Sequence, residues 1–288
     1  MGIFMLGKSD DKDDRQTSGV LIQYLYELSD YLKERTMSKK AVTMAVAALM
    51  LAGLMGVHYR ASGSVLPTSG AASDRTLPIY CVQTDEPKIA LTFDAAWGNQ
   101  DTQKIMDILK KHDIKVTFFM TGGWVDAYPD DVKMIREAGH DLGNHSQNHK
   151  NMSQLSDSEK EKELMSVHDK VKALTGYDMF LFRPPYGDYD NAVVTTAKKC
   201  GYYAIQWDVD SLDWKDYGVE SILKTVTQNE HLGNGSIILC HNGAKYTAEA
   251  LDTLIITLKD AGYTFVPLSE LIYRDGYHMD HEGRQIKD

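Results

Sequence analysis

Two histidines four residues apart are the most distinctive chemical feature of the sequence. His145 and His149 stand in the stretch HSQNH, directly after a short run that reads as a strand. At this spacing two side chains lie on one side of a helical turn, where both can bind the same metal ion. Such pairs also occur by chance, so the interpretation depends on which other ionisable residues lie nearby.

Other ionisable residues stand where further strands are expected to end. Asp94 ends the run LTFD, Arg183 ends FLFR, and His241 ends ILCH. In parallel barrels the carboxyl ends of the strands meet at one face, which carries the chemistry. We therefore expect these side chains to surround one site, where the two histidines of HSQNH bind a metal ion.

Strand-like and helix-like segments alternate from residue 86 almost to the end of the chain. Expected helices include 124–138, 156–174 and 247–261, and the second of these begins with the capping box Ser156-x-x-Glu159. The expected strands are 88–93, 115–121, 141–145, 179–183, 202–208, 236–241 and 264–267. This alternation predicts an α/β fold with a parallel sheet closed into a barrel. An open doubly wound sheet is the alternative, because the sequence does not show closure.

Residues 41–57 form an apolar segment without a charged side chain. As a helix it would span about 26 Å, close to the lower limit for a hydrocarbon core of about 30 Å. Lys39 and Lys40 precede it, so the positive-inside rule places 1–40 in the cytoplasm and the rest of the chain outside the cell. We expect a single-pass anchor in the cell membrane. A cleaved signal peptide with secretion and a buried core helix are the alternatives.

The remaining segments complete the expected organisation. Residues 58–85 are expected to form an extracytoplasmic stalk, 86–275 the folded domain, and 276–288 a polar C-terminal tail. The net charge is -10, and the acidic excess lies after residue 40, because 1–40 hold equal numbers of acidic and basic residues. An acidic domain excludes nucleic acid as a partner, since binding it needs clustered Lys and Arg. The sequence identifies no protein partner.

Five short motifs, in this order, resemble those of the polysaccharide deacetylases with the NodB homology domain, carbohydrate esterase family 4. They are TFDA (Thr92–Ala95), HSQNH (His145–His149), RPPYG (Arg183–Gly187), DSLDW (Asp210–Trp214) and LCH (Leu239–His241). The resemblance covers about residues 86–273. It implies a distorted (β/α)7-type barrel. It also implies metal-assisted hydrolysis of N-acetyl groups on the amino sugars of a peptidoglycan-like cell-wall glycan.

The resemblance implies roles for the residues that would activate the attacking water. Asp94 would be the general base, and Arg183 would keep it ionised and oriented. His145 and His149 would bind a divalent metal ion that polarises the acetamide carbonyl. Zinc is the expected ion, with cobalt or manganese as alternatives.

Further roles concern the carbonyl oxygen, the leaving amine and the acetyl methyl group. The backbone N–H of Tyr186 would face the developing oxyanion. His241 would protonate the leaving amine, and Asp213 would hold the other nitrogen of its ring. Trp214 and Leu239 would enclose the methyl group.

The first motif departs from the family pattern at Ala95. The family's usual first motif has two adjacent aspartates, a base and then a metal ligand, whereas here an alanine follows Asp94. Two histidines without a carboxylate are expected to bind metal weakly. The form TFDAAWG resembles a subgroup associated with spore formation in Gram-positive bacteria. The alternative function is therefore a weakened or inactive protein that binds glycan or serves as a sporulation factor. A hydrolase of a small amide or ester is the third candidate.

Overall fold

The computed structural model describes residues 75–288. The expected cytoplasmic tail (1–40), the expected anchor (41–57) and most of the expected stalk therefore lie outside the described residues. Within 75–288, no helix combines the length and the apolar character needed to cross a membrane.

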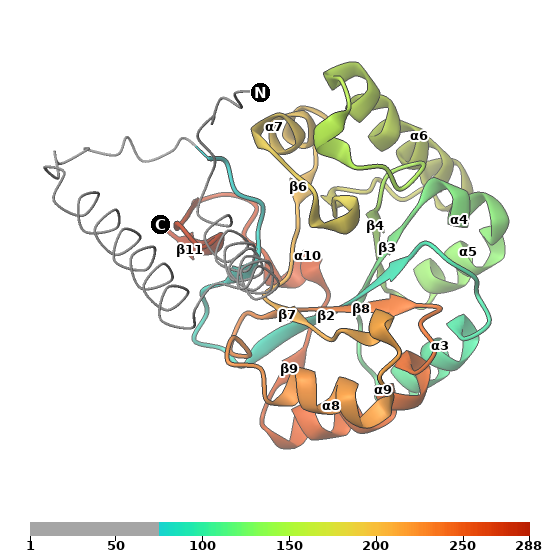
Figure 1. Cartoon of the computed structure of the whole chain (residues 1–288), viewed down its shortest axis with the longest axis vertical. Helices are drawn as coiled ribbons and strands as arrows, with labels where there is room; N and C mark the ends of the chain where they lie inside the picture. Colours follow the sequence, from blue (N-terminus) through green and yellow to red (C-terminus); the bar gives the residue numbers. More distant parts are fainter. Residues whose placement is uncertain (1–74) are drawn as a thin grey trace, which may run out of the picture. The chain divides into compact units, whose positions relative to one another are not determined.

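A sheet of parallel strands forms the centre of the domain (Figure 1). Its strands follow the spatial order β6, β5, β4, β3, β2, β8 and β7. Their bounds are β2 Lys88–Ala95, β3 Thr117–Met120, β4 Asp141–Asn144, β5 Leu181–Phe182, β6 Tyr203–Ala204, β7 Val209–Asp210 and β8 Ile237–Asn242. A further strand, β9 (Thr264–Phe265), pairs with the first two residues of β2. The expected parallel α/β architecture is confirmed, although the run 202–208 was not expected to lead into a separate strand, β7.

The sheet is a half-barrel, because the strands at its two ends, β6 and β7, are not neighbours in the strand order. The chain ahead of β2 lies against both sides of this opening. Ile79 donates its N–H to Ala204 O at 2.8 Å and accepts a hydrogen bond from Gln206 N at 2.7 Å, next to β6. Val82 N donates to Gly235 O at 3.0 Å, just before β8. Backbone hydrogen bonds of this segment thus connect residues next to β6 with the residue just before β8, while the parallel sheet itself stays a half-barrel.

A small second sheet joins the two ends of the described chain. The strand β1 (Cys81–Val82) pairs in parallel with β11 (Arg284–Lys287), and β11 pairs antiparallel with β10 (Tyr277–Met279). The domain limits expected at 85 and 276 therefore differ from the structure. Residues 79–82 are part of the folded unit rather than of a stalk, and 276–288 form strands rather than a tail.

The helices α3 to α9 lie around the outside of the parallel sheet, whereas α10 packs with Ala90 of β2 in a second, smaller hydrophobic cluster (Figure 1). The helix bounds are α3 Thr102–Lys111, α4 Gly122–Ala127, α5 Pro129–Glu137, α6 Asp157–Thr175, α7 Asn191–Lys199, α8 Val219–Thr227, α9 Thr247–Asp260 and α10 Leu268–Leu271. The capping box at the start of α6 is confirmed, with the Ser156 side chain accepting from Glu159 N. The single helix expected at 124–138 is instead two helices. Pro129 begins the second, because a proline disfavours the helical conformation of the residue before it.

Alternation along β2 separates its chemical face from its packing face. Ile89, Leu91, Phe93 and Ala95 are buried in the larger hydrophobic core, which includes residues of the surrounding helices. Successive side chains of a strand point to opposite faces, so Asp94 lies on the inner face. The strand thus directs its carboxylate into the barrel and its alanine towards the helices.

Candidate active site

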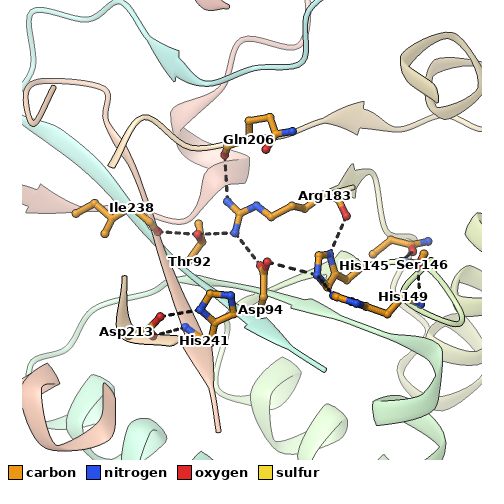
Figure 2. Close-up of polar contacts among 11 residues, drawn as sticks. Thr92, Asp94, His145, Ser146, His149, Arg183, Gln206, Asp213, Ile238 and His241 are labelled. Atoms are coloured by element: carbon orange, nitrogen blue, oxygen red, sulfur yellow. Dashed lines mark hydrogen bonds and ion pairs between the residues drawn. The ribbon is translucent and has the colours of Figure 1, made fainter. Parts of the chain in front are cut away.

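Asp94 and Arg183 form a buried ion pair at the carboxyl ends of β2 and β5 (Figure 2). Arg183 Nη1 lies 2.8 Å from Asp94 Oδ1, and the two residues are 0% and 5% exposed. Burial is the largest single influence on the pKa of Asp94 and raises it. The Arg183 cation, with smaller effects of nearby histidines, outweighs burial and holds this pKa below its usual value. Asp94 is therefore ionised at neutral pH and able to accept a proton.

Further contacts fix the orientation of the guanidinium group. Arg183 Nη1 also donates to Thr92 Oγ1 at 2.8 Å, and Thr92 in turn donates to Ile238 O on β8. Arg183 Nη2 donates to the backbone oxygen of Gln206 at 3.1 Å (Figure 2). The face of the group lies 4.2 Å from the centre of the Phe119 ring, within cation–π distance. The cation therefore approaches Asp94 in one geometry.

His145 and His149 present one ring nitrogen each to the same point beside Asp94 (Figure 2). Their Nε2 atoms are 3.2 Å apart, and His145 Nε2 lies 3.4 Å from Asp94 Oδ2. His145 Nδ1 lies 2.8 Å from Arg183 O, and because a carbonyl only accepts, Nδ1 carries the proton. Burial lowers the pKa of His145 to about 4 and also lowers that of His149. Both rings are thus neutral at pH 7, as metal ligands must be.

The loop that carries the two histidines is not helical, so the expected helical turn is wrong. Ser146 and His149 have left-handed backbone conformations, with φ of 65° and 53°. The loop is held by His149 N, which donates to Ser146 Oγ at 3.0 Å, and by Glu163 of α6. The Glu163 carboxylate accepts from the backbone and the side chain of Asn148, both at 2.7 Å. Glu163 is a positioning residue that the sequence did not identify.

The donor set fits a divalent ion in part. Two neutral imidazole nitrogens converge, and a carboxylate oxygen of Asp94 lies beside them. Among residues 75–288, no group of three or more His, Cys, Asp or Glu side chains suited to hold a metal ion is found. Ala95 has no donor atom, and it is fully buried in the core on the helix side of β2. Any ion held here would therefore rely on His145 and His149, and weak binding stays a prediction.

His241 forms a second side-chain pair with Asp213. His241 and Asp94 are neighbours across the β8–β2 pairing, and Figure 2 shows the imidazole close to the Asp94 carboxylate. Asp213 Oδ1 lies 2.7 Å from His241 Nδ1, and its Oδ2 accepts from Thr247 Oγ1 at 2.6 Å. Burial, the largest influence, lowers the pKa of His241, but the adjacent carboxylates, led by Asp213, raise it above its usual value. His241 is therefore a better proton carrier at neutral pH than a free imidazole.

The three remaining expected site residues lie near these pairs. Tyr186 has a left-handed φ of 60°, and its exposed ring lies 4.5 Å from the His149 ring. Leu239 is buried on β8, two residues before His241. Trp214 is half-exposed directly after Asp213, so it does not belong to the core.

Two further residues at the site were not assigned a role from the sequence. Gln206 is buried, and its Nε2 donates to Gly187 O at 3.1 Å, next to Tyr186. Trp97 lies with its ring 5.4 Å from the His241 ring. Trp97 is visible in the motif TFDAAWG, whereas nothing in the sequence around Gln206 indicates its contact.

Comparison with known proteins gives a consistent family. Residues 82–205 match the family model described as polysaccharide deacetylase. The chain is 35% identical over 202 residues to the peptidoglycan-N-acetylmuramic acid deacetylase PdaA of Bacillus subtilis (strain 168), covering 67% of this chain and 74% of that protein. Among solved structures, a wild-type Bacillus anthracis protein described as a CE4 family pseudoenzyme is 35% identical, with a TM-score of 0.66 over 73% of this chain and 70% of the other. A mutant of a CE4 family pseudoenzyme with restored enzymatic activity is 36% identical, with a TM-score of 0.66 over 73% of each chain.

Proposed function

The chain belongs to the polysaccharide deacetylase family (carbohydrate esterase family 4), and we propose that it removes N-acetyl groups from amino sugars of a peptidoglycan-like cell-wall glycan. The observation that carries this proposal is the meeting of three groups at one end of the parallel sheet. They are the Asp94–Arg183 pair, the two facing histidines and the His241–Asp213 pair. Together they offer a base for water, a place for an electrophile and an acid for the leaving amine.

In this proposal the attacking water gives its proton to Asp94. A divalent ion bound by His145 and His149 would polarise the acetamide carbonyl and make the water more acidic. Asp94 Oδ2 is the oxygen that faces His145, while Oδ1 is engaged by Arg183. Arg183 thereby holds the base ionised without blocking the oxygen that accepts the proton.

The leaving nitrogen would receive its proton from His241. Asp213 engages Nδ1, so Nε2 is the ring nitrogen that remains for the substrate. The raised pKa of His241 favours the protonated form that an acid needs. The backbone N–H of Tyr186 would stabilise the oxyanion, and Leu239 and Trp214 would border the acetyl methyl group.

A protein that binds glycan but has weak or no activity is the second candidate, and Ala95 is the observation that favours it. A carboxylate ligand is missing at this position, and a similar Bacillus anthracis structure is described as a pseudoenzyme. The motif TFDAAWG also supports the proposal of a role in sporulation. Both candidates keep the same glycan-binding face and differ in whether a metal ion is bound well enough for turnover.

Acetate release from peptidoglycan fragments separates the two candidates. The full-length protein is incubated with a chelator, and then with Zn²⁺, Co²⁺ or Mn²⁺ added. We expect metal-dependent release of acetate that is lost in Asp94→Asn. Binding of the fragments without acetate release under any of these conditions would instead support the glycan-binding protein.

Zinc titration by calorimetry tests whether Ala95 limits metal binding. We expect Ala95→Asp to bind zinc at least about tenfold more tightly, since ligand changes exceed the effect of changes around the ligands. Ala95 is the last residue of β2 and directly follows Asp94, at the position where the family's usual first motif has a carboxylate ligand. Ala96→Asp is the matched control and is expected to leave the affinity unchanged. Equal affinities of wild type and Ala95→Asp would contradict the assignment.

We also propose that the chain is attached to the cell membrane by 41–57, with residues 1–40 in the cytoplasm and the catalytic domain outside. A cell-wall substrate and the lysines before this apolar segment support the proposal. Protease added to intact cells should remove the domain and spare the tail. Digestion of the tail from outside would contradict this topology.

A further inference from the structure

Exposed large hydrophobic side chains concentrate at the candidate active site. Within the described residues there are five, and all but Ile256 of α9 belong to this group: Trp97, Tyr186, Trp214 and Tyr217. Trp97 contacts the ring of His241, Tyr186 contacts the ring of His149, and Trp214 directly follows Asp213. Lys215 Nζ lies 5.1 Å from the Trp214 ring and 6.0 Å from the Tyr217 ring, which links Tyr217 to the same loop. Exposed apolar surface gathered in this way is typical of a ligand-binding surface.

Trp97 is in ring contact with a site histidine but has no role in the catalytic assignments, and hydrogen bonds hold the residue that follows it. The next residue, Gly98, accepts hydrogen bonds at its oxygen from Trp124 Nε1 at 3.2 Å and from Asn242 Nδ2 at 3.1 Å. On the other side, a Cβ at Gly243 would lie 3.6 Å from the Trp97 Cβ, so the start of the Trp97 side chain lies close to this backbone. Trp97 nevertheless remains 51% exposed. The exposed indole is therefore presented by an anchored loop.

The chemistry of deacetylation decides which part of the substrate lies next to His241. The bond between the carbonyl carbon and the nitrogen breaks, a water-derived hydroxyl joins the carbon, and the nitrogen takes a proton and stays on the sugar. The acetyl group therefore belongs on the side of His145 and His149, and the sugar ring belongs on the side of His241. Trp97 is in ring contact with His241 at 5.4 Å, where the sugar ring is expected.

We propose that Trp97 is the platform on which the pyranose ring bearing the scissile acetamide stacks. The C–H groups on one face of a pyranose carry a partial positive charge, and the face of an indole carries the negative side of its quadrupole. An indole beside the acid thus selects an amino sugar over a small amide or ester that has no such face. This inference rests on the proposed function for the orientation of the substrate.

The test compares full-length wild type with Trp97→Ala, Trp97→Phe and the control Ile256→Ala, which removes an exposed apolar side chain of α9. Binding of N-acetylchitotetraose is measured by calorimetry with a chelator present, so that no turnover occurs. We expect Trp97→Ala to raise Kd about tenfold and Trp97→Phe to raise it less, in the range of aromatic contacts. Ile256→Ala should bind as wild type does, and thermal unfolding shows whether each variant is folded.

A second substrate separates sugar binding from an effect on His241. With zinc present, hydrolysis of 4-nitrophenyl acetate should keep the same kcat/KM in Trp97→Ala, while KM for acetate release from glycan rises. Equal loss on the ester and on the glycan would show that Trp97 acts through His241 and would overturn the inference. An unchanged Kd in Trp97→Ala, or no binding of the oligosaccharide by folded wild type, would overturn it as well. Glycan binding that depends on Trp97 without acetate release would contradict the proposed activity and support the platform.

Discussion

The Asp94–Arg183 pair is expected to stabilise the protein only as long as both partners are present. Arg183 is completely buried, so Arg183→Met removes the cation and leaves the Asp94 charge without a partner in the interior. Breaking a buried pair from one side costs about 3–5 kcal/mol. Asp94→Asn leaves the guanidinium unpaired and is expected to cost a similar amount. The double variant keeps two neutral side chains, so its loss should be at least about 2 kcal/mol smaller than the sum of the single losses.

Urea unfolding of the four full-length proteins at pH 7.5 measures this coupling. The matched control is the exposed pair Lys172–Asp178, whose charged atoms are 2.6 Å apart and whose side chains are 53% and 64% exposed. In the same double-mutant cycle with Lys172→Met and Asp178→Asn, the coupling free energy between the two residues is expected to be less than about 1 kcal/mol, because water screens exposed pairs. Effects of Arg183→Met and Asp94→Asn that add to within about 0.5 kcal/mol would refute the reasoning.

The direction in which stability changes with pH is an independent test of the same pair. In the wild-type protein the pKa of Asp94 is lower in the folded state than in the unfolded state. Ionised Asp94 therefore stabilises the fold at pH values above its unfolded pKa, and this stabilisation is lost as the pH falls through its folded pKa. In Arg183→Met burial acts without the opposing cation and raises the folded pKa above the unfolded one. The contribution of Asp94 to the free energy of unfolding of this variant then becomes more favourable as the pH falls. A pH profile with the wild-type sign in Arg183→Met would contradict this account.

Two further variants test buried groups that the sequence did not identify. Gln206→Leu removes the Nε2–Gly187 O hydrogen bond beside Tyr186, and we expect kcat for acetate release to fall about tenfold with KM and zinc affinity unchanged. A matching change in KM or zinc affinity would contradict this positioning role. Asp208→Asn tests a carboxyl group whose pKa is raised by burial from 3.8 to about 6, partly offset by hydrogen bonds from Ile237 N and Ser236 Oγ. Between these values the folded protein binds a proton that the unfolded chain does not, so wild-type stability should decrease as the pH rises through this range. Urea unfolding from pH 4 to 8 should lack this decrease in Asp208→Asn, and parallel profiles would contradict the prediction.

The strand ends were predictable because each is marked by a local signal. Asp94 and His241 follow apolar runs that are long enough to be recognised as buried strands. Because parallel strands direct their carboxyl ends to one face, the sequence also predicted that these two residues lie at the same site. The loop between His145 and His149 was not predictable in the same way. Its shape depends on Glu163, which lies on the next helix and is indistinguishable in the sequence from an exposed acidic residue.

The half-barrel, and the segment before β2 that lies across its opening, could not be predicted for a similar physical reason. The segment from Ile79 to Val82 binds through backbone groups to residues near β6 and β8, more than a hundred positions away. Every residue type can accept a backbone hydrogen bond, and every type except proline can donate one. Such hydrogen bonds therefore leave no pattern in the amino-acid composition. The pairing of β1 with β11 is equally distant in sequence, and both strands are too short to show an alternation.

Ala95 connects the packing of β2 to the chemistry of the site. The sequence alone presents this alanine as a missing ligand, whereas in the structure it is a well-packed residue on the helix side of the strand, in the same core cluster as Phe93. Asp94, on the inner face of β2, still lies beside Arg183 and His145, so the proposed base keeps these contacts without a neighbouring carboxylate. In the proposed function the alanine would therefore weaken only the metal affinity and leave the proposed acid, the proposed base and the aromatic surface near His241 intact. Restoring a ligand should for this reason change the zinc dependence of the protein far more than its affinity for glycan.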